Sequence, residues 1–200
     1  DYELLELALF AVVPREDVKE RAKAILNEFG GDLTALFAAP RERLMQIQDV
    51  GEKIADHIAL IGQFVRRTSK QQMKERDVLS SWHAVVAYCT SAMAGQTTEQ
   101  FRILFLDRKN KLLKDEVQNR GTVDHTPVYP REVVKRALEL GASAIILVHN
   151  HPSGDPTPSS SDVEMTKQIV DAARTLDIGV HDHLIIGRTG HASLKQLGLM

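Results

Sequence analysis

A polar segment about one third of the way along the chain separates two regions with different hydrophobic patterns. Residues 68–78 read TSKQQMKERDV and show almost no apolar periodicity, which is typical of an interdomain linker. Before this segment, apolar residues recur only at helical spacing, and no strand pattern is present. After it, strand and helix patterns alternate along the chain. We therefore predict an all-α domain over residues 1–67, a linker over 68–79 and an α/β or α+β domain over 80–200.

Local patterns predict the elements of the second domain. Pro130 is typical of a first helical position and Gly141 of a helix end. The continuous apolar run from Ala144 to His149 predicts a buried strand. The expected order is helix, strand, hairpin strand, helix, strand, helix and strand, at residues 80–94, 101–106, 111–117, 130–141, 144–149, 160–176 and 180–186.

The overall composition excludes several classes of protein. An apolar fraction of 43% with 26% charged residues is ample for a packed core and excludes intrinsic disorder. No apolar run approaches the ~20 residues that a membrane-spanning helix needs. The single cysteine, Cys89, excludes a disulfide framework and a cysteine-rich zinc module. Because the chain begins at Asp1 without a methionine or signal peptide, we expect a fragment of a cytoplasmic protein.

Several candidate metal-binding side chains lie at the end of the predicted buried strand and directly after it. His149 and His151 are two residues apart, so their side chains project on the same side of an extended chain. A turn rich in proline follows, and Asp162 lies one turn inside the next predicted helix. Two histidines and a carboxylate leave a fourth position open around zinc, which is the arrangement of a catalytic site. The alternative explanation is structural, because Ser159 and Asp162 also have the spacing of a helix capping box.

The segment His149-x-His151-Pro152, seven residues, Ser159-x-x-Asp162 resembles the JAMM signature of MPN-domain metalloproteases. Further segments resemble the bacterial RadC family, a branch of that group, and they are Gly121-Thr122-Val123, Tyr129-Pro130-Arg131-Glu132, His149 to Asp155 and Asp182-His183. The resemblance implies a mixed β-sheet flanked by helices. It also implies that a zinc ion is held by His149, His151 and Asp162.

The same resemblance implies a zinc-dependent hydrolase that cleaves a peptide or isopeptide bond. Ser159 would orient the water or stabilise the oxyanion. A glutamate should serve as general base; we expect Glu99, at the start of a strand, and Glu116 on the hairpin partner is the alternative. His181 and His183 share one face of the last strand and are a further, weaker candidate for metal binding.

Residues 44–55 are similar to a helix-hairpin-helix, a motif whose turn binds DNA phosphates at a helix N-terminus. Asp49 replaces the first glycine of that turn, and residues 1–67 carry nine basic and twelve acidic side chains. Nucleic-acid binding by this part should therefore be weak, with some contribution from the basic tract Arg66–Arg76. The alternative function is a non-enzymatic DNA-binding protein of replication or repair, in which the metal site is structural or vestigial.

Overall fold

The computed structural model describes residues 1–200 except 14–16, 76–77, 79, 81, 121–127 and 189. The first part of the chain is helical, as predicted, and the described residues before 76 contain no strand. Its helices are α1 (Tyr2–Phe10), α2 (Lys19–Asn27), α3 (Leu33–Ala38), α4 (Arg41–Leu44) and α5 (Glu52–Glu75). None of the described helices is both long and apolar enough to cross a bilayer.

The helix ends in this part have the local geometry that their residues favour. Gly30 and Gly31 follow α2 with positive φ angles of 64° and 82°, a backbone conformation that glycine adopts without strain. The Asp32 carboxylate accepts a hydrogen bond of 2.7 Å from the Thr34 N–H and caps α3. Asp49, in the turn between α4 and α5, has a φ of 61°, which explains why a glycine would be favoured there.

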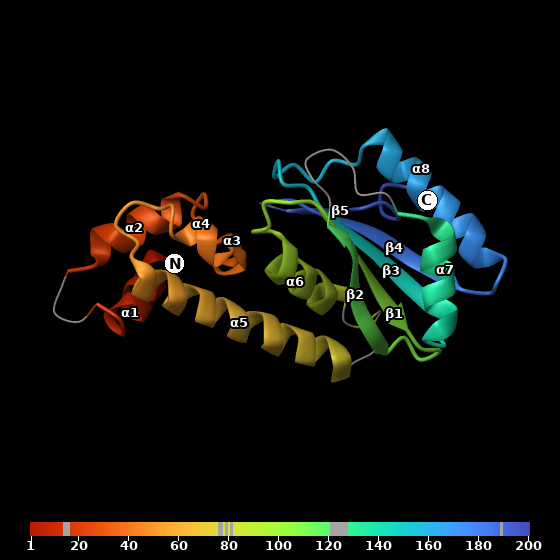
Figure 1. The fold of residues 1–200 in the computed structure, drawn as a ribbon, viewed down its shortest axis with the longest axis horizontal. Coiled ribbons are helices and arrows are strands. Elements are labelled where there is room, and N and C mark those ends of the chain that lie inside the picture. Colours follow the sequence, from red (N-terminus) through yellow and green to blue (C-terminus); the bar gives the residue numbers. More distant parts are fainter. Residues whose placement is uncertain (14–16, 76–77, 79, 81, 121–127, 189) are drawn as a thin grey trace.

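The segment expected to be a linker is helical over residues 68–75, because α5 continues through them to Glu75. These residues are mostly lysine, glutamine, methionine and glutamate, which favour helix even without an apolar stripe. The helix also gains a tertiary anchor, since Lys70 Nζ lies 2.9 Å from the Asp115 carboxylate on the sheet. The two parts of the chain are thus joined by a long helix that runs towards the sheet (Figure 1).

The second part is the predicted α/β fold with a mixed sheet. Its elements are α6 (Trp82–Met93), β1 (Gln100–Leu106), β2 (Leu112–Arg120), α7 (Pro130–Glu139), β3 (Ala144–Asn150), α8 (Ser160–Arg174), β4 (Gly179–Ile186) and β5 (His191–Ser193). The strand order is β2-β1-β3-β4-β5, with β3 and β4 parallel and the other neighbours antiparallel. The short edge strand β5 was not predicted, because three residues are too few to show an alternating pattern.

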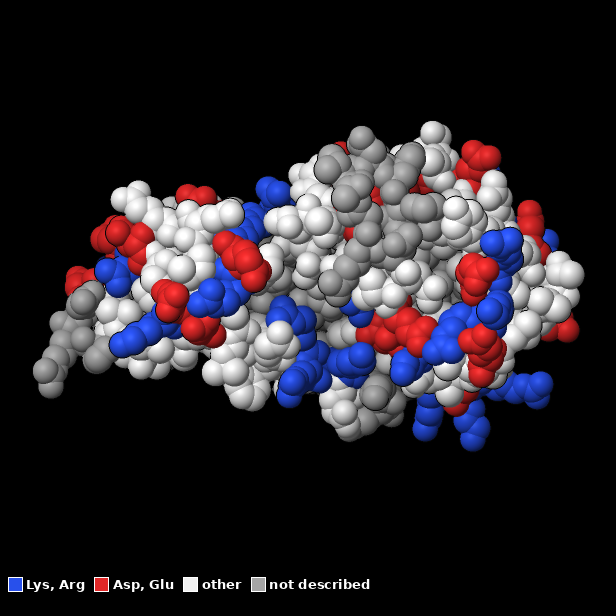
Figure 2. Space-filling view, viewed as in Figure 1, with Lys and Arg blue, Asp and Glu red and all other residues white. Residues whose placement is uncertain are grey.

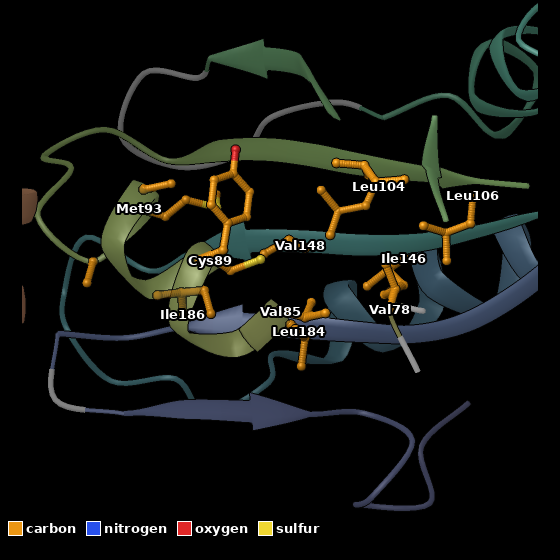
Figure 3. Close-up of a cluster of buried hydrophobic side chains, with 14 of the residues drawn as sticks. Val78, Val85, Cys89, Met93, Leu104, Leu106, Ile146, Val148, Leu184 and Ile186 are labelled. Atoms are coloured by element: carbon orange, nitrogen blue, oxygen red, sulfur yellow. The ribbon is translucent and has the colours of Figure 1, made fainter. Parts of the chain in front are cut away.

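The sheet buries apolar side chains on both faces. On one face α6 packs Val85, Cys89 and Met93 against the sheet (Figure 3). On the other face α7 and α8 pack against a cluster that includes Ile145 and Leu147 of β3. Because side chains alternate along a strand, His149 continues this second series and points to the α8 face.

The helical part touches the second part through α5 and α3, which both pack against α6. A methyl group added at Gly95, just after α6, would lie 2.4–2.5 Å from the backbone of Ala38 and Ala39. A methyl group at Gly62 of α5 would lie 2.1 Å from the Phe37 carbonyl oxygen. The end of α3 is therefore held backbone to backbone against both neighbouring segments.

We expect Gly95→Ala to destabilise the protein by about 1–3 kcal/mol, because the added methyl group overpacks this junction. The free energy of unfolding can be measured in urea. Gly190→Ala is the matched control, since a methyl group there meets no atom within 4 Å. Equal stability of the two variants would show that the close contact at Gly95 is not needed.

Candidate metal centre

The two predicted histidines come together where β3 ends. His149 is fully buried, while His151 is partly exposed at the start of the following loop. The Phe101 ring of the neighbouring strand stacks on the His149 ring, with centroids 6.2 Å apart. The Nε2 atoms of His149 and His151 face each other at 2.9 Å.

The first turn of α8 supplies the third predicted residue, Asp162. The capping box is present: Ser159 Oγ accepts a hydrogen bond from the Asp162 N–H, and Asp162 Oδ2 accepts one of 2.8 Å from the Ser159 N–H. The same carboxylate approaches both histidines, with Oδ1 3.3 Å from His149 Nε2 and Oδ2 3.5 Å from His151 Nε2. The structural and the metal-binding explanations are therefore compatible, because the cap fixes the carboxylate that faces the histidines.

The spacing of these side chains fits a small tetrahedral cation. Bonds of about 2.0–2.1 Å in tetrahedral geometry place ligand atoms about 3.3 Å apart, and the three contacts here are 2.9, 3.3 and 3.5 Å. Among the described residues, this is the one cluster of three or more histidine, cysteine or acidic side chains with such geometry. The group His149, His151 and Asp162 can therefore hold a metal ion.

Hydrogen bonds behind His149 fix its tautomer. The Thr166 hydroxyl donates to the Asp162 carbonyl oxygen (2.6 Å), so it accepts from Nδ1–H of His183, also at 2.6 Å. His183 is fully buried, and burial lowers its pKa well below the usual value, so its Nε2 is a free acceptor. His149 Nδ1–H then donates to that atom at 2.7 Å, which turns the lone pair of His149 Nε2 towards the cluster.

This chain of contacts corrects the idea of a second metal site on β4. His183 orients His149, and His181 Nε2 contacts Asn110 Oδ1 at 2.8 Å. The supporting roles of His183 and Thr166 are not evident from the sequence, because only the parallel pairing of β3 with β4 and the packing of α8 bring these residues together.

The His151 ring, like that of His149, turns its Nε2 lone pair towards the cluster. Its Nδ1 lies 2.8 Å from the Asp155 carbonyl oxygen, which can only accept, so Nδ1 carries the proton. Two Nε2 lone pairs would then oppose each other at 2.9 Å, and either a cation or a proton on His151 relieves that opposition. Its hydrogen bond with Asp162 raises the pKa of His151, whereas burial lowers the pKa of His149 to about 4.

The Asp162 carboxylate is the charged member of the site. Burial by itself would raise its pKa, but the hydrogen bond from His151, the nearby His149 and the hydrogen bonds from Ser159 bring the pKa well below its usual value. Ser159 Oγ lies 2.6 Å from Asp162 Oδ2 and 2.9 Å from Ser161 Oγ. In this arrangement Ser159 holds Asp162, and its predicted contact with substrate stays a prediction.

Glu99 immediately precedes β1, beside the end of β3. It is partly buried, and its charge contributes to the raised pKa of His151. The buried Asn150 side chain holds the backbone on both sides of Glu99: Oδ1 accepts from the Gln100 N–H (2.9 Å), and Nδ2 donates to the Thr98 carbonyl oxygen (3.1 Å). The role of Asn150 is not evident from the sequence, because only the register of β1 against β3 reveals it.

The alternative base, Glu116, is engaged elsewhere. It lies on β2, which β1 separates from β3, and it receives two hydrogen bonds from Arg136 of α7, at 2.6 and 2.8 Å. These bonds lower the pKa of Glu116. The structure therefore brings Glu99, and not Glu116, towards the histidine pair.

The basic tract predicted for nucleic-acid contacts is divided between different environments. Arg66 donates to the Phe37 carbonyl oxygen at 3.3 Å, Lys70 pairs with Asp115, and Arg67 is exposed. Arg76 lies outside the described residues, as does the Gly121–Val123 segment of the RadC resemblance. Nucleic-acid binding by the helical part stays a prediction.

Comparison with protein families agrees with the metal centre and the fold. A family model described as the RadC-like JAB domain matches residues 79–199, which is more than half of the chain and contains every element from α6 onwards. The match does not extend to the helical part, so the helix-hairpin-helix resemblance stands on its sequence alone. The chain belongs to the family of RadC-like JAB domain proteins.

Proposed function

We propose that this protein is a zinc-dependent metallopeptidase of the JAMM type, which cleaves a peptide or isopeptide bond. The observation that supports this most strongly is the convergence of His149, His151 and Asp162 with both histidine lone pairs turned inwards. Bound there, zinc would supply a Lewis acid that polarises a carbonyl group and lowers the pKa of a water molecule.

The roles of the protein side chains follow from their positions. His149, His151 and Asp162 would hold the ion, and His183 and Thr166 would keep His149 in the binding tautomer. Glu99 would take a proton from the attacking water and return it to the leaving amine. Ser159 would keep the carboxylate of Asp162 in place, and its hydroxyl group is the candidate donor to the substrate oxygen.

Amide hydrolysis is favoured over phosphoryl transfer by the carboxylates of the loop. Two-metal phosphoryl chemistry needs several clustered carboxylates. Here Asp155 accepts hydrogen bonds from the N–H and hydroxyl groups of Thr157, at 2.9 and 2.6 Å, so its carboxylate is used within the loop. The described cluster offers Asp162 as its one carboxylate ligand.

The proposal can be tested with a mixture of peptides of known sequence. The protein is stripped of metal, divided, and one half is reloaded with one equivalent of zinc. New peptide amino termini are then counted by mass spectrometry. We expect cleavage by the zinc-loaded half only; equal cleavage by both halves would contradict the proposal.

Asn150→Ala should reduce hydrolysis by about 10- to 100-fold, because the backbone around Glu99 loses both of its anchors and the carboxylate is misplaced. Metal content should stay unchanged, since Asn150 is not a ligand. Asn150→Asp keeps an acceptor for the Gln100 N–H and should retain more activity than Asn150→Ala. Loss of metal in either variant would show that Asn150 supports the metal site instead.

A further inference from the structure

A cleft of about 470 Å³ lies between the helical part and the sheet, away from the metal centre. Its walls are formed by the end of α3, one face of α5, part of α6 and the start of β1. On β1 it is lined by Gln100 and Arg102, which alternate with Phe101 and so point to the α6 face. The metal centre lies on the opposite, α8 face of the sheet.

The lining of this cleft is strongly basic. Five cationic side chains line it, and no aspartate or glutamate does; the five are Arg41, Arg66, Arg67, Lys70 and Arg102. Two carboxylates outside the lining pair with three of these cations: Asp56 pairs with Arg41 at 2.5 Å, and the buried Asp115 pairs with both Lys70 and Arg102, at 2.9 and 2.6 Å. Figure 2 shows Lys and Arg atoms gathered over the C-terminal half of α5. The cleft therefore has more positive than negative charge.

Two of these cations have no carboxylate partner within the described part of the chain. Arg66 is half-buried and donates to a neutral carbonyl oxygen, that of Phe37; burial lowers its pKa. Arg67 follows it on α5 and is exposed. In addition, Nε–H of Arg102 is buried without an acceptor among the described groups. Like charges in a shared cleft focus the local field and favour a bound anion.

We propose that this cleft binds a compact anion that carries several phosphate groups, of the size of a nucleoside triphosphate. Its volume is within the range of about 300–1,000 Å³ that is usual for small-ligand sites. Arginine guanidinium groups match phosphate oxygens with pairs of parallel hydrogen bonds. The amide side chains of Gln63, Gln96 and Gln100 also line the cleft and can bond neutral parts of such a ligand.

A compact ligand fits this cleft better than a nucleic-acid strand. The whole chain has a net charge of −2, so the excess of positive charge at the cleft is a local feature and not a property of the whole chain. Tyr88 is the one aromatic residue in the lining, and it is buried, with its hydroxyl group bonded to Asp115. The cleft therefore lacks the stacking platform on which single-stranded bases bind.

The proposal is tested by calorimetric titration of the whole chain with ATP, with inorganic tripolyphosphate and with a twelve-residue oligothymidylate at fixed ionic strength. We expect ATP to bind, and Arg66→Gln/Arg67→Gln to weaken that binding at least tenfold. Arg108→Gln/Lys109→Gln is the matched control, because it removes two exposed charges from the β1–β2 turn and should change the affinity less than twofold. Binding should also persist in His149→Ala/His151→Ala, which excludes the metal centre as the site.

Each remaining outcome decides the question. Tripolyphosphate binding as tightly as ATP supports recognition of phosphate alone, and tighter binding of ATP supports added contacts to the nucleoside. If only the oligonucleotide binds, the cleft is a nucleic-acid site and the proposal is wrong. It is also wrong if neither ATP nor tripolyphosphate binds at millimolar concentration, or if both double variants bind equally. Arg67→Glu tests the same point with an exposed residue, should the loss of Arg66 disturb folding.

Discussion

His149→Ala/His151→Ala should reduce the metal content of the protein from about one zinc ion per chain to almost none. The remaining Asp162 carboxylate offers a single ligand, which cannot hold zinc against water and buffer. Elemental analysis of freshly purified protein, and of protein titrated with zinc and then dialysed, measures this directly. Hydrolysis of any peptide that the unaltered protein cleaves should disappear together with the metal.

His191→Ala is the matched control for this experiment. His191 is exposed at the start of β5 and is not among the clustered ligands, so its loss should leave the zinc content unchanged. Full zinc content in the double variant would place the metal elsewhere and overturn the proposed site. Absence of zinc from the unaltered protein, even after titration, would instead favour a function in binding.

The pH dependence of zinc binding should show competition with a single proton. Because the hydrogen bond with Asp162 raises the pKa of His151, this side chain holds a proton at pH values below the ordinary histidine pKa of about 6.5 and must lose that proton to bind metal. Burial keeps the pKa of His149 at about 4, so His149 stays neutral in the same range. The apparent zinc affinity should thus fall about tenfold for each pH unit between pH 6.5 and 5. A hundredfold fall per unit, measured against a chromogenic chelator, would contradict this.

Glu99→Gln should reduce kcat/KM by about 10²- to 10⁴-fold while leaving the zinc content unchanged. The amide keeps the shape of the side chain but cannot accept a proton, so only the acid–base contribution is lost. Activity is measured on the best peptide found in the library, and zinc is measured in the same sample. A loss of both would make Glu99 a metal-site residue, not a base.

Glu116→Gln is the control for Glu99→Gln, because it removes a carboxylate that is expected to have a structural role and not a catalytic one. This change removes the same charge from a neighbouring strand and weakens the pair with Arg136. It should lower stability slightly and change kcat/KM less than threefold. If Glu116→Gln were the inactive variant and Glu99→Gln the active one, the assignment of the base would be reversed.

The fold was predictable where the chain carries its own local signals. Gly30-Gly31, Asp32 and Pro130 mark helix ends through backbone geometry and capping, and the apolar run from Ala144 is enough for a buried strand. The end of α5 was not predictable, because its last turns show no apolar pattern. They are stabilised by helix propensity and by the ion pair between Lys70 and Asp115.

Within the site, only the candidate metal ligands were predictable from the sequence. His149 lies near the end of β3 and His151 follows two residues later, and the capping-box spacing brings Asp162 to the start of a helix. The groups behind them, His183 and Asn150, act across strands whose order and register no single-sequence pattern reveals. Their contributions therefore had to be found in the structure.

The proposed metal ligands and the proposed base come from different segments of the chain. His149, Asp162, Thr166 and His183 all lie within one β3–α8–β4 unit, whereas Glu99 belongs to the segment that begins β1. Local opening that separates β1 from β3 would move Glu99 away while the ion stays bound. Such a partly unfolded molecule would bind metal without cleaving a substrate. Hydrolysis therefore depends on the pairing of β1 with β3, whereas metal content does not.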